Sequence, residues 1–507
     1  MKVSIVSLGD LKKKKIDIFA FGIFESSEKK NPDLSALFSS LKTVPASLQD
    51  QLAATAQKEG FCGKSGQQFV INTLSQAGPA YIMLVGLGLQ DKISIDAYRK
   101  AGGLAFRLAN DKRVTSFSFL LSLPPTAISA ETALSAAIEG VYLSRYRFDK
   151  YFTENKPEIF IEDICLACID KNYKTNQELV QNSKAIADGV CFARDLINEG
   201  PWVVNPPALA KRALKEGKAL GLDVEVLEEK ELEKENMNLI LAVGKASAKV
   251  APPCLIRLSY RPTKKAKKHI VLVGKGVTFD SGGLDIKPAD GMLDMKVDMS
   301  GAAAVFATML TVAKLKPNVS VTGYLACVEN GIGPHAYHPG DVIKSRRGFT
   351  VEINNTDAEG RLILADALDF AQSKEKPDYL IDLATLTGAC MVALGPQTAG
   401  LFSTQDELAD SLMKLGKTAG EDYWRMPLNE DLREQLKSSV ADMKNTGTRY
   451  GGSITAALFL KKFVNDGTPW AHLDIAGPAT QDKDHPYTSK GGAGFGVRTL
   501  IAFICQW

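Results

Sequence analysis

The chain has 507 residues, of which 45% are hydrophobic and 23% are charged, which is typical of a soluble globular protein with more than one domain. Its 61 lysines and arginines nearly balance its 58 aspartates and glutamates, so the overall charge does not favour a nucleic-acid-binding protein. Eight cysteines are too few for a disulfide framework, and neither a secretory signal nor a membrane-spanning run stands out, so we expect a cytoplasmic protein with reduced thiols.

The first 170 residues alternate between strand-like and helix-like patterns. Short runs rich in apolar and β-branched residues predict strands at residues 4–8, 16–24, 69–74, 81–88 and 159–164. Helical periodicity predicts helices at residues 93–111 and 128–146. The pair Cys165 and Cys168 follows the last of these strands with no second CxxC pair, so we interpret it as two packed thiols and not as a redox or zinc motif.

A long helical pattern at residues 175–198 separates two regions, and Gly200 and Pro201 end it. We therefore predict an N-terminal α/β domain over residues 1–172, a linking helix over 173–198 and a C-terminal α/β domain over 199–507. In the second domain, strands are predicted at 269–276, 320–330, 378–388 and 470–477, and helices at 301–315, 361–372 and 454–464.

Two acids and a base stand on alternate positions in NTDAEGRL, residues 355–362. In an extended chain, Asp357, Glu359 and Arg361 would all face the same side. The stretch follows a strand-like run and precedes a helix that begins near Arg361, so both acids are expected on a connecting turn. In open α/β sheets, ligands bind at such strand-to-helix connections.

A second polar cluster, GKGVTFDSGGLDIKP, covers residues 274–288 after another predicted strand. It carries Lys275, Asp280, Asp285 and Lys287 around two adjacent glycines. Asp285 has no evident role and is expected to be a solvated loop acid.

A third acid, Asp298, precedes an apolar helix rich in small residues. Three separate turns are thus expected to present acids at strand ends. Because a buried group of carboxylates repels itself unless cations neutralise it, the pattern predicts a site for divalent ions. From spacing alone, Lys275 is expected to form an ion pair with one of these acids.

These blocks, together with those at residues 298–303, 384–389 and 470–477, resemble the leucyl aminopeptidases of the M17 metallopeptidase family. The resemblance is strong over residues 185–507 and extends to the N-terminal region only in general layout. It implies a smaller, macro-like N-terminal α/β domain and a larger C-terminal α/β catalytic domain with a mixed central sheet. It also implies a homohexamer.

The resemblance implies a site for two divalent metal ions, zinc or manganese. Asp280 and Glu359 would bridge both ions, Asp357 would bind one of them, and Lys275 and Asp298 would complete the other. A lysine ligand must be neutral, so the pKa of Lys275 would have to fall far below its ordinary value near 10.4.

The implied activity is metal-dependent release of N-terminal residues from peptides by a hydroxide that bridges the ions. Lys287 would donate to the developing oxyanion, and Arg361 would hold a bicarbonate ion that acts as the general base. Gly360 would allow the backbone to approach that anion closely.

The resemblance further assigns the substrate pocket to Met295, Thr385, Leu386 and Gly388, with a preference for leucine and other apolar side chains. By its position alone, Met295 could instead be a core residue. His472, in a predicted strand, is expected to be a structural hydrogen-bonding residue.

Two alternatives remain open. One is a dipeptidase that cleaves Cys-Gly or similar small peptides at the same site. The other is a peptidase with a secondary DNA-binding role through the basic runs at residues 12–15 and 264–269, which the balanced overall charge disfavours.

Overall fold

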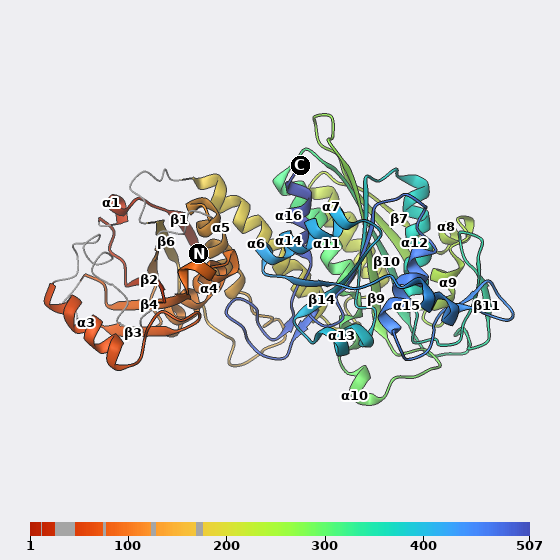
Figure 1. The fold of residues 1–507 in the computed structure, drawn as a ribbon, viewed down its shortest axis with the longest axis horizontal. Helices are drawn as coiled ribbons and strands as arrows, with labels where there is room; N and C mark the ends of the chain where they lie inside the picture. Colours follow the sequence, from red (N-terminus) through yellow and green to blue (C-terminus); the bar gives the residue numbers. More distant parts are fainter. Residues whose placement is uncertain (12, 26–45, 75–77, 123–127, 169–175) are drawn as a thin grey trace. The chain divides into compact units, whose positions relative to one another are not determined.

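The structure, a computed structural model, describes the whole chain except residue 12 and residues 26–45, 75–77, 123–127 and 169–175. The described residues form two compact units (Figure 1). The N-terminal unit contains Met1–Asp188 and Asp484–Ser489, and the C-terminal unit contains Gly189–Lys483 and Lys490–Trp507. Helix α6 (Gln177–Asn198) contributes residues to both units. The start of the predicted linking helix and Lys12 lie outside the described residues.

The N-terminal unit is built on a six-stranded sheet in the order β1-β6-β5-β2-β4-β3. Neighbouring strands are parallel except for β3, which pairs antiparallel with β4. The strands are β1 (Lys2–Ile5), β2 (Ile18–Phe24), β3 (Gln68–Asn72), β4 (Tyr81–Gly88), β5 (Ser116–Leu121) and β6 (Asp163–Cys168). The helices are α1 (Leu8–Leu11), α3 (Ala46–Lys58), η1 (Gln90–Lys92), α4 (Ile95–Asp111) and α5 (Ala130–Ser144).

Serine caps begin two of the predicted helices. The side chain of Ser94 accepts a hydrogen bond from the amide at the start of α4, and that of Ser129 does the same for α5. The strand predicted at residues 159–164 instead begins at Asp163 and includes Cys165 and Cys168. Both cysteines are buried within hydrophobic clusters of this unit, so the interpretation as packed thiols is confirmed.

The C-terminal unit contains an eight-stranded sheet in the order β15-β14-β17-β13-β9-β10-β8-β7. Its centre, β17-β13-β9-β10, is parallel, whereas β14, β8 and β7 each pair antiparallel with a neighbour. The predicted mixed central sheet is therefore confirmed. The strands are β7 (Asp223–Leu227), β8 (Cys254–Tyr260), β9 (His269–Asp280), β10 (Ser320–Asn330), β13 (Tyr379–Ala384), β14 (Thr398–Ser403), β15 (Asp422–Arg425) and β17 (Trp470–Asp474).

Helices and two small sheets complete this unit. The helices are α7 (Pro206–Ala219), α8 (Glu229–Lys234), α9 (Asn238–Gly244), α10 (Ala289–Met292), η2 (Met295–Met299), α11 (Ser300–Leu315), α12 (Gly360–Lys374), α13 (Gly388–Leu394), α14 (Asp406–Ala419), η3 (Glu430–Leu436), α15 (Gly452–Lys461) and α16 (Val497–Cys505). The small sheets contain β11 (Val342–Lys344), β12 (Thr350–Glu352) and β16 (Met443–Lys444), and β18 (Thr480–Gln481) and β19 (Gly491–Gly492).

Among the residues that the structure describes, the helical stretch 289–315 is long and apolar enough to cross a membrane by length and composition, although no membrane-spanning run was predicted. Most of it is buried inside the unit, because α11 packs against β9 and β10 of the central sheet. A helix that is apolar all round is expected at such a position in a protein core.

Two strands near the acids are present as predicted, but the extent of one and the sheet membership of the other matter for the site. The strand predicted at residues 269–276 continues to Asp280, so Lys275 lies within β9 and Asp280 ends it. The short strand before NTDAEGRL, β12, belongs to the small sheet with β11 and β16 and not to the central sheet. Asp298 also lies in η2 and not after a strand.

Candidate active site

The carboxyl ends of the four parallel central strands carry polar residues. Asp280 ends β9, Asn330 ends β10, Asp474 ends β17, and Thr385 directly follows β13. Asp280 and Asn330 are register partners, and Asn330 Nδ2 donates to Asp280 Oδ1 over 2.8 Å. Because parallel strands end at the same edge of a sheet, these residues form one polar edge, which is where open α/β sheets bind ligands.

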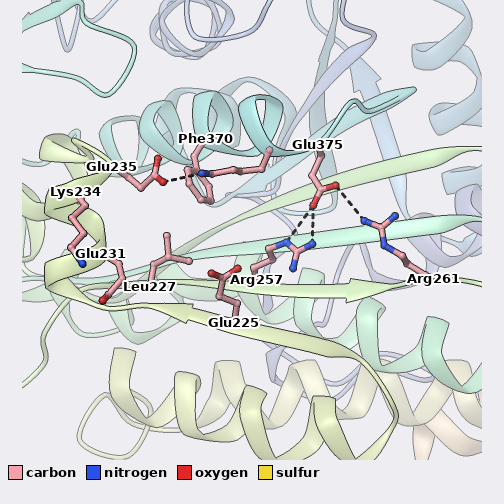
Figure 2. Close-up of a pocket in the computed structure, with 10 residues that line it drawn as sticks. Glu225, Leu227, Glu231, Lys234, Glu235, Arg257, Arg261, Phe370 and Glu375 are labelled. Carbon is pink, nitrogen blue, oxygen red and sulfur yellow. Dashed lines mark hydrogen bonds and ion pairs between the residues drawn. The ribbon is translucent and has the colours of Figure 1, made fainter.

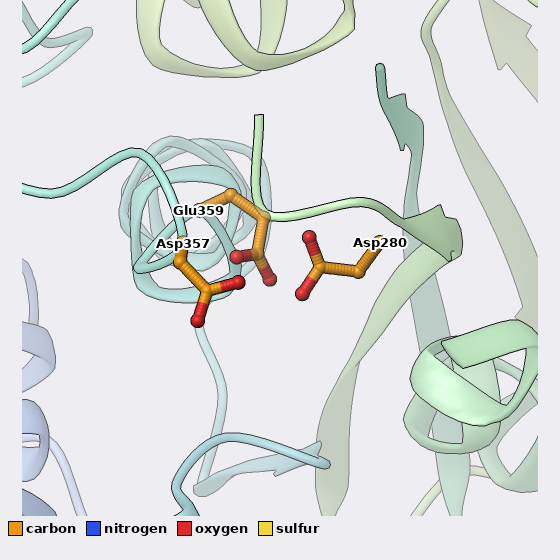
Figure 3. Close-up of side chains that lie close together, drawn as sticks. All are labelled: Asp280, Asp357 and Glu359. Atoms are coloured by element: carbon orange, nitrogen blue, oxygen red, sulfur yellow. The ribbon is translucent and has the colours of Figure 1, made fainter. Parts of the chain in front are cut away.

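Two further carboxylates reach this edge from the connection between β12 and α12. Oxygens of Asp280, Asp357 and Glu359 lie within 4.8 Å of one another, and the three carboxylates point toward one another (Figure 3). The stretch is not extended: Asp357 lies in a turn, and Glu359 already has helical backbone angles, φ −78° and ψ −36°. The alternate spacing therefore does not place the acids and Arg361 on one extended face. A turn followed by a helix start brings the two acids together.

Lys275 lies between two of the acids. Its Nζ is 2.8 Å from Asp298 Oδ1 and 2.8 Å from Glu359 Oε1, and it donates to the carbonyl oxygen of Thr385 over 2.8 Å. Burial lowers the pKa of Lys275, but the surrounding carboxylates outweigh burial and raise it above its ordinary value. The ion pair expected from spacing alone is therefore present, with two acids and not one.

Lys287 bridges the other two carboxylates. Its Nζ lies 2.8 Å from Asp280 Oδ2 and 2.5 Å from Asp357 Oδ1. Burial lowers the pKa of Lys287, whereas the two aspartates raise it further, so the net shift is upward and the ammonium stays charged. The side chain of Lys287 is partly exposed, so its ammonium lies between the buried Asp280 and solvent.

The four carboxylates carry more negative charge than the two lysines neutralise. Burial raises the pKa of Asp298, Glu359 and Asp357, and nearby carboxylates add to the shift. Within the described part of the chain, Asp298 Oδ2 and Glu359 Oε2 are buried without a hydrogen-bond partner. Buried, unsatisfied carboxylate oxygens are a donor set that suits divalent cations, so the residues present fit the metal ions that the sequence predicts.

Arg361 lies in the first turn of α12 and is buried. Its Nη1 donates to the carbonyl oxygen of Asn445 over 2.8 Å, while Nε has no partner among the residues that the structure describes. Burial lowers the pKa of Arg361 to about 10, although Glu359 and Asp474 act against this shift. A buried guanidinium with an unused donor suits a small anion.

Close packing against Lys275 requires glycine at position 360, independently of any bound anion. A Cβ at this position would lie 2.5 Å from Cε and 2.6 Å from Nζ of Lys275. Because Lys275 is held by three partners, it cannot move away easily. The helix start can therefore approach the lysine only with glycine at this position.

The predicted pocket residues lie on two segments beside the acids. Met295 begins η2 and is half-buried, and Thr385 and Leu386 are half-buried while Gly388 is exposed at the start of α13. Thr385 Oγ1 donates to Asp298 Oδ1 over 2.8 Å. Leu386 also packs against the main hydrophobic core of this unit.

Sequence reasoning missed the residue that shapes this loop, Asp474. Its carboxylate is fully buried and accepts hydrogen bonds from the amide of Leu386 over 3.2 Å and the hydroxyl of Thr387 over 2.6 Å. Its neighbour in β17, His472, places Nδ1 2.6 Å from Asp382 Oδ1, which confirms the predicted structural role of that histidine. Only the position of Asp474 at a strand end could have indicated its function.

A separate cavity of about 400 Å³ lies at the other end of α12 (Figure 2). Its charges pair with one another: Arg257 and Arg261 contact Glu375, and Lys374 contacts Glu235. Since α12 rises about 1.5 Å per residue, this cavity lies roughly 20 Å along the helix from the acids. It is therefore distinct from the carboxylate site.

Comparison with known proteins identifies the chain. The model of the cytosol aminopeptidase family catalytic domain matches residues 191–501, and that of the family's N-terminal domain matches residues 20–155. This chain belongs to the cytosol aminopeptidase family. A probable cytosol aminopeptidase of Aquifex aeolicus is 44% identical over 454 residues, which are 89% of this chain and 90% of the relative. One of Persephonella marina is 41% identical over 509 residues, with 99% of both chains covered.

Solved structures agree with this family. A variant of tomato leucine aminopeptidase matches with a TM-score of 0.88 and 34% identity, and covers 100% of this chain and 97% of its own. The bottromycin maturation enzyme BotP in complex with Mn matches with a TM-score of 0.82 and 34% identity, covering 97% and 99%. As a member of the cytosol aminopeptidase family, the chain is a metal-dependent aminopeptidase that acts on peptides, with the two-domain architecture of that family.

Proposed function

We propose that this aminopeptidase releases leucine and other apolar N-terminal residues from peptides at a site for two divalent ions, zinc or manganese. The convergence of Asp280, Asp357 and Glu359 within 4.8 Å carries the proposal. Asp280 and Glu359 would be shared by both ions, and Asp357 would bind one of them. Lys275 and Asp298 would complete the second site. By family resemblance, the assembly would be a homohexamer.

The two ions, when bound, would supply a hydroxide nucleophile and polarise the scissile carbonyl. Lys275 would bind as a neutral amine, so its proton must leave as its two ion pairs with Asp298 and Glu359 are replaced. Lys287, which stays charged beside Asp280 and Asp357, would donate to the oxygen of the scissile carbonyl as negative charge develops there. The half-buried Met295 and the loop at Thr385–Gly388 would contact the first side chain of the peptide.

Arg361 would hold a bicarbonate ion through its unused guanidinium donor. When bound there, bicarbonate would supply a general base beside the carboxylates, and Arg361 would hold and orient it. Burial of Arg361 supports this role, because an ion pair formed away from water is stronger.

Replacing Arg361 by methionine is expected to lower kcat about 100- to 10,000-fold, the usual contribution of a general base, while both metal ions are retained. The wild-type kcat should rise with added bicarbonate in bicarbonate-depleted buffer, and the variant should not respond. Steady-state kinetics and metal analysis by mass spectrometry measure both effects. Loss of the metals in the variant would instead make Arg361 a structural residue, which its hydrogen bond to Asn445 could explain.

The proposed activity is tested first with leucine p-nitroanilide and its N-acetylated form, before and after chelation. Cleavage of the free-amine form alone, abolished by a chelator and restored by zinc or manganese, is the expected result. Equal cleavage of both forms would contradict recognition of the N-terminal amine. Stronger cleavage of Cys-Gly than of leucine substrates would instead support the dipeptidase.

A further inference from the structure

We propose that Asp285 is a positioning residue that holds the Asp357–Glu359 turn against the Asp280 strand end by fixing Thr356. This inference rests on the proposed function, because it assigns a role in spacing the carboxylates that would bind the ions. Neither the resemblance nor the sequence pattern assigned a role to Asp285 or Thr356.

Asp285 and Thr356 are 71 positions apart in the chain and are joined by reciprocal hydrogen bonds. The amide of Thr356 donates to Asp285 Oδ2 over 2.7 Å, and the amide of Asp285 donates to Thr356 Oγ1 over 2.8 Å. The Thr356 hydroxyl in turn donates to the carbonyl oxygen of Gly282 over 2.7 Å, and it lies 3.1 Å from Asp285 Oδ2. We call this arrangement of Asp285, Thr356 and Gly282 the clasp.

The remaining polar atom of Thr356, its carbonyl oxygen, is also held. It accepts hydrogen bonds from Asn330 Nδ2 over 3.1 Å and from the Tyr337 hydroxyl over 2.6 Å. Asn330 Nδ2 also donates to Asp280 Oδ1, so one side chain connects the clasp to the end of β9. Thr356 and Asn330 are fully buried, so water does not compete for these hydrogen bonds.

The loop that carries Asp285 is shaped to receive Thr356. Gly282 and Gly283 have φ values of +86° and +67°, in the left-handed region that favours glycine. A Cβ at Gly283 would lie 2.9 Å from Thr356 Oγ1. The loop begins after Asp280 and leads to Lys287, so its conformation also sets the position of the lysine that bridges Asp280 and Asp357.

The clasp counteracts the electrostatic repulsion between the carboxylates of the site. Asp280, Asp357 and Glu359 repel one another, and β12, the strand before Asp357, is paired in a small separate sheet and not with β9. The clasp ties the residue directly before Asp357 to the loop directly after Asp280. Asp285 itself is exposed and its Oδ2 is taken by Thr356, so it is placed to support the carboxylates and not to join them as a ligand.

The test compares Asp285→Ala with Asp285→Asn by titration of the metal-depleted protein with Mn²⁺ in a calorimeter. Asparagine keeps an oxygen that can accept from the Thr356 amide, but it removes the charge. We expect the alanine variant to weaken Mn²⁺ binding about 10-fold or more, as for residues that orient metal ligands, and the asparagine variant to stay within about 3-fold of the wild type. Asp290→Ala, on an exposed acid of the following helix, is the control for a general loss of negative charge.

A second pair of variants, at Thr356, tests the same contact independently in case Asp285→Ala folds poorly. Thr356→Val removes the hydroxyl at constant size and should weaken Mn²⁺ binding similarly, whereas Thr356→Ser should restore it. The effects of Thr356→Val and Asp285→Ala should be less than additive in the double variant, because both remove the contact between Thr356 Oγ1 and Asp285 Oδ2.

Equal weakening by Asp285→Asn and Asp285→Ala would show that the charge matters and would overturn the clasp. Binding by Asp285→Ala within about 2-fold of the wild type would overturn it as well. A wild-type protein that binds no Mn²⁺ would instead refute the proposed function, so the two failures are distinguishable.

Discussion

Replacing Glu359 by glutamine is expected to lower kcat/KM about 1,000-fold or more and to remove one of two bound metal equivalents. Glutamine keeps the shape of the side chain but removes the charge that two ions would share. Metal-ion catalysis supplies several kcal/mol of transition-state stabilisation, and each 1.36 kcal/mol is tenfold in rate, which sets this magnitude. Steady-state kinetics and metal analysis after desalting give the two quantities.

The control for this substitution is Glu233→Gln, which makes the same chemical change at an exposed position of α8. It should leave both metal content and kcat/KM unchanged. A Glu359→Gln enzyme that keeps two tightly bound ions would contradict the assignment of Glu359 as a bridging ligand. A variant that loses metal but keeps its activity would contradict the role of the ions themselves.

Replacing Lys287 by methionine is expected to lower kcat about 100- to 1,000-fold, the cost of removing one donor to a developing oxyanion. The metal ions should be retained and bound no more weakly, because the substitution removes a cation that lies 2.8 Å from Asp280 and 2.5 Å from Asp357. Single-turnover kinetics with leucine p-nitroanilide, together with Mn²⁺ titration, separates the two effects.

Lys287→Arg distinguishes charge from geometry at this position. It keeps the positive charge but presents a planar group, so it should recover only part of kcat. If Lys287→Met lost the metals and not kcat, the lysine would serve to hold Asp280 and Asp357 in place. An unchanged kcat would remove Lys287 from the catalytic residues.

Many helices and strands could be predicted because local hydrophobic patterns in the sequence indicate them. The periodic run at residues 301–315 became α11 with one extra residue at its start, and the strand predicted at 320–330 matched β10. The extent of β9 was underestimated, because the predicted strand stops at Gly276, a residue type that is disfavoured inside strands. Membership of β12 in a small separate sheet could not be predicted, since strand pairing depends on partners that are distant in the chain.

The residue types of the site and, through a family resemblance, the activity could be predicted from the amino-acid sequence. NTDAEGRL and the block at residues 274–288 contain three of the four carboxylates, both lysines and Arg361, and the block at residues 298–303 contributes Asp298. The way in which these groups come together depends on contacts between segments that are distant in the chain. Asp474 shapes the loop after β13, Gly360 makes room for Lys275, and Asp285 fixes Thr356. These contacts join segments far apart in sequence through single hydrogen bonds and close packing, which leave no periodic pattern in the chain.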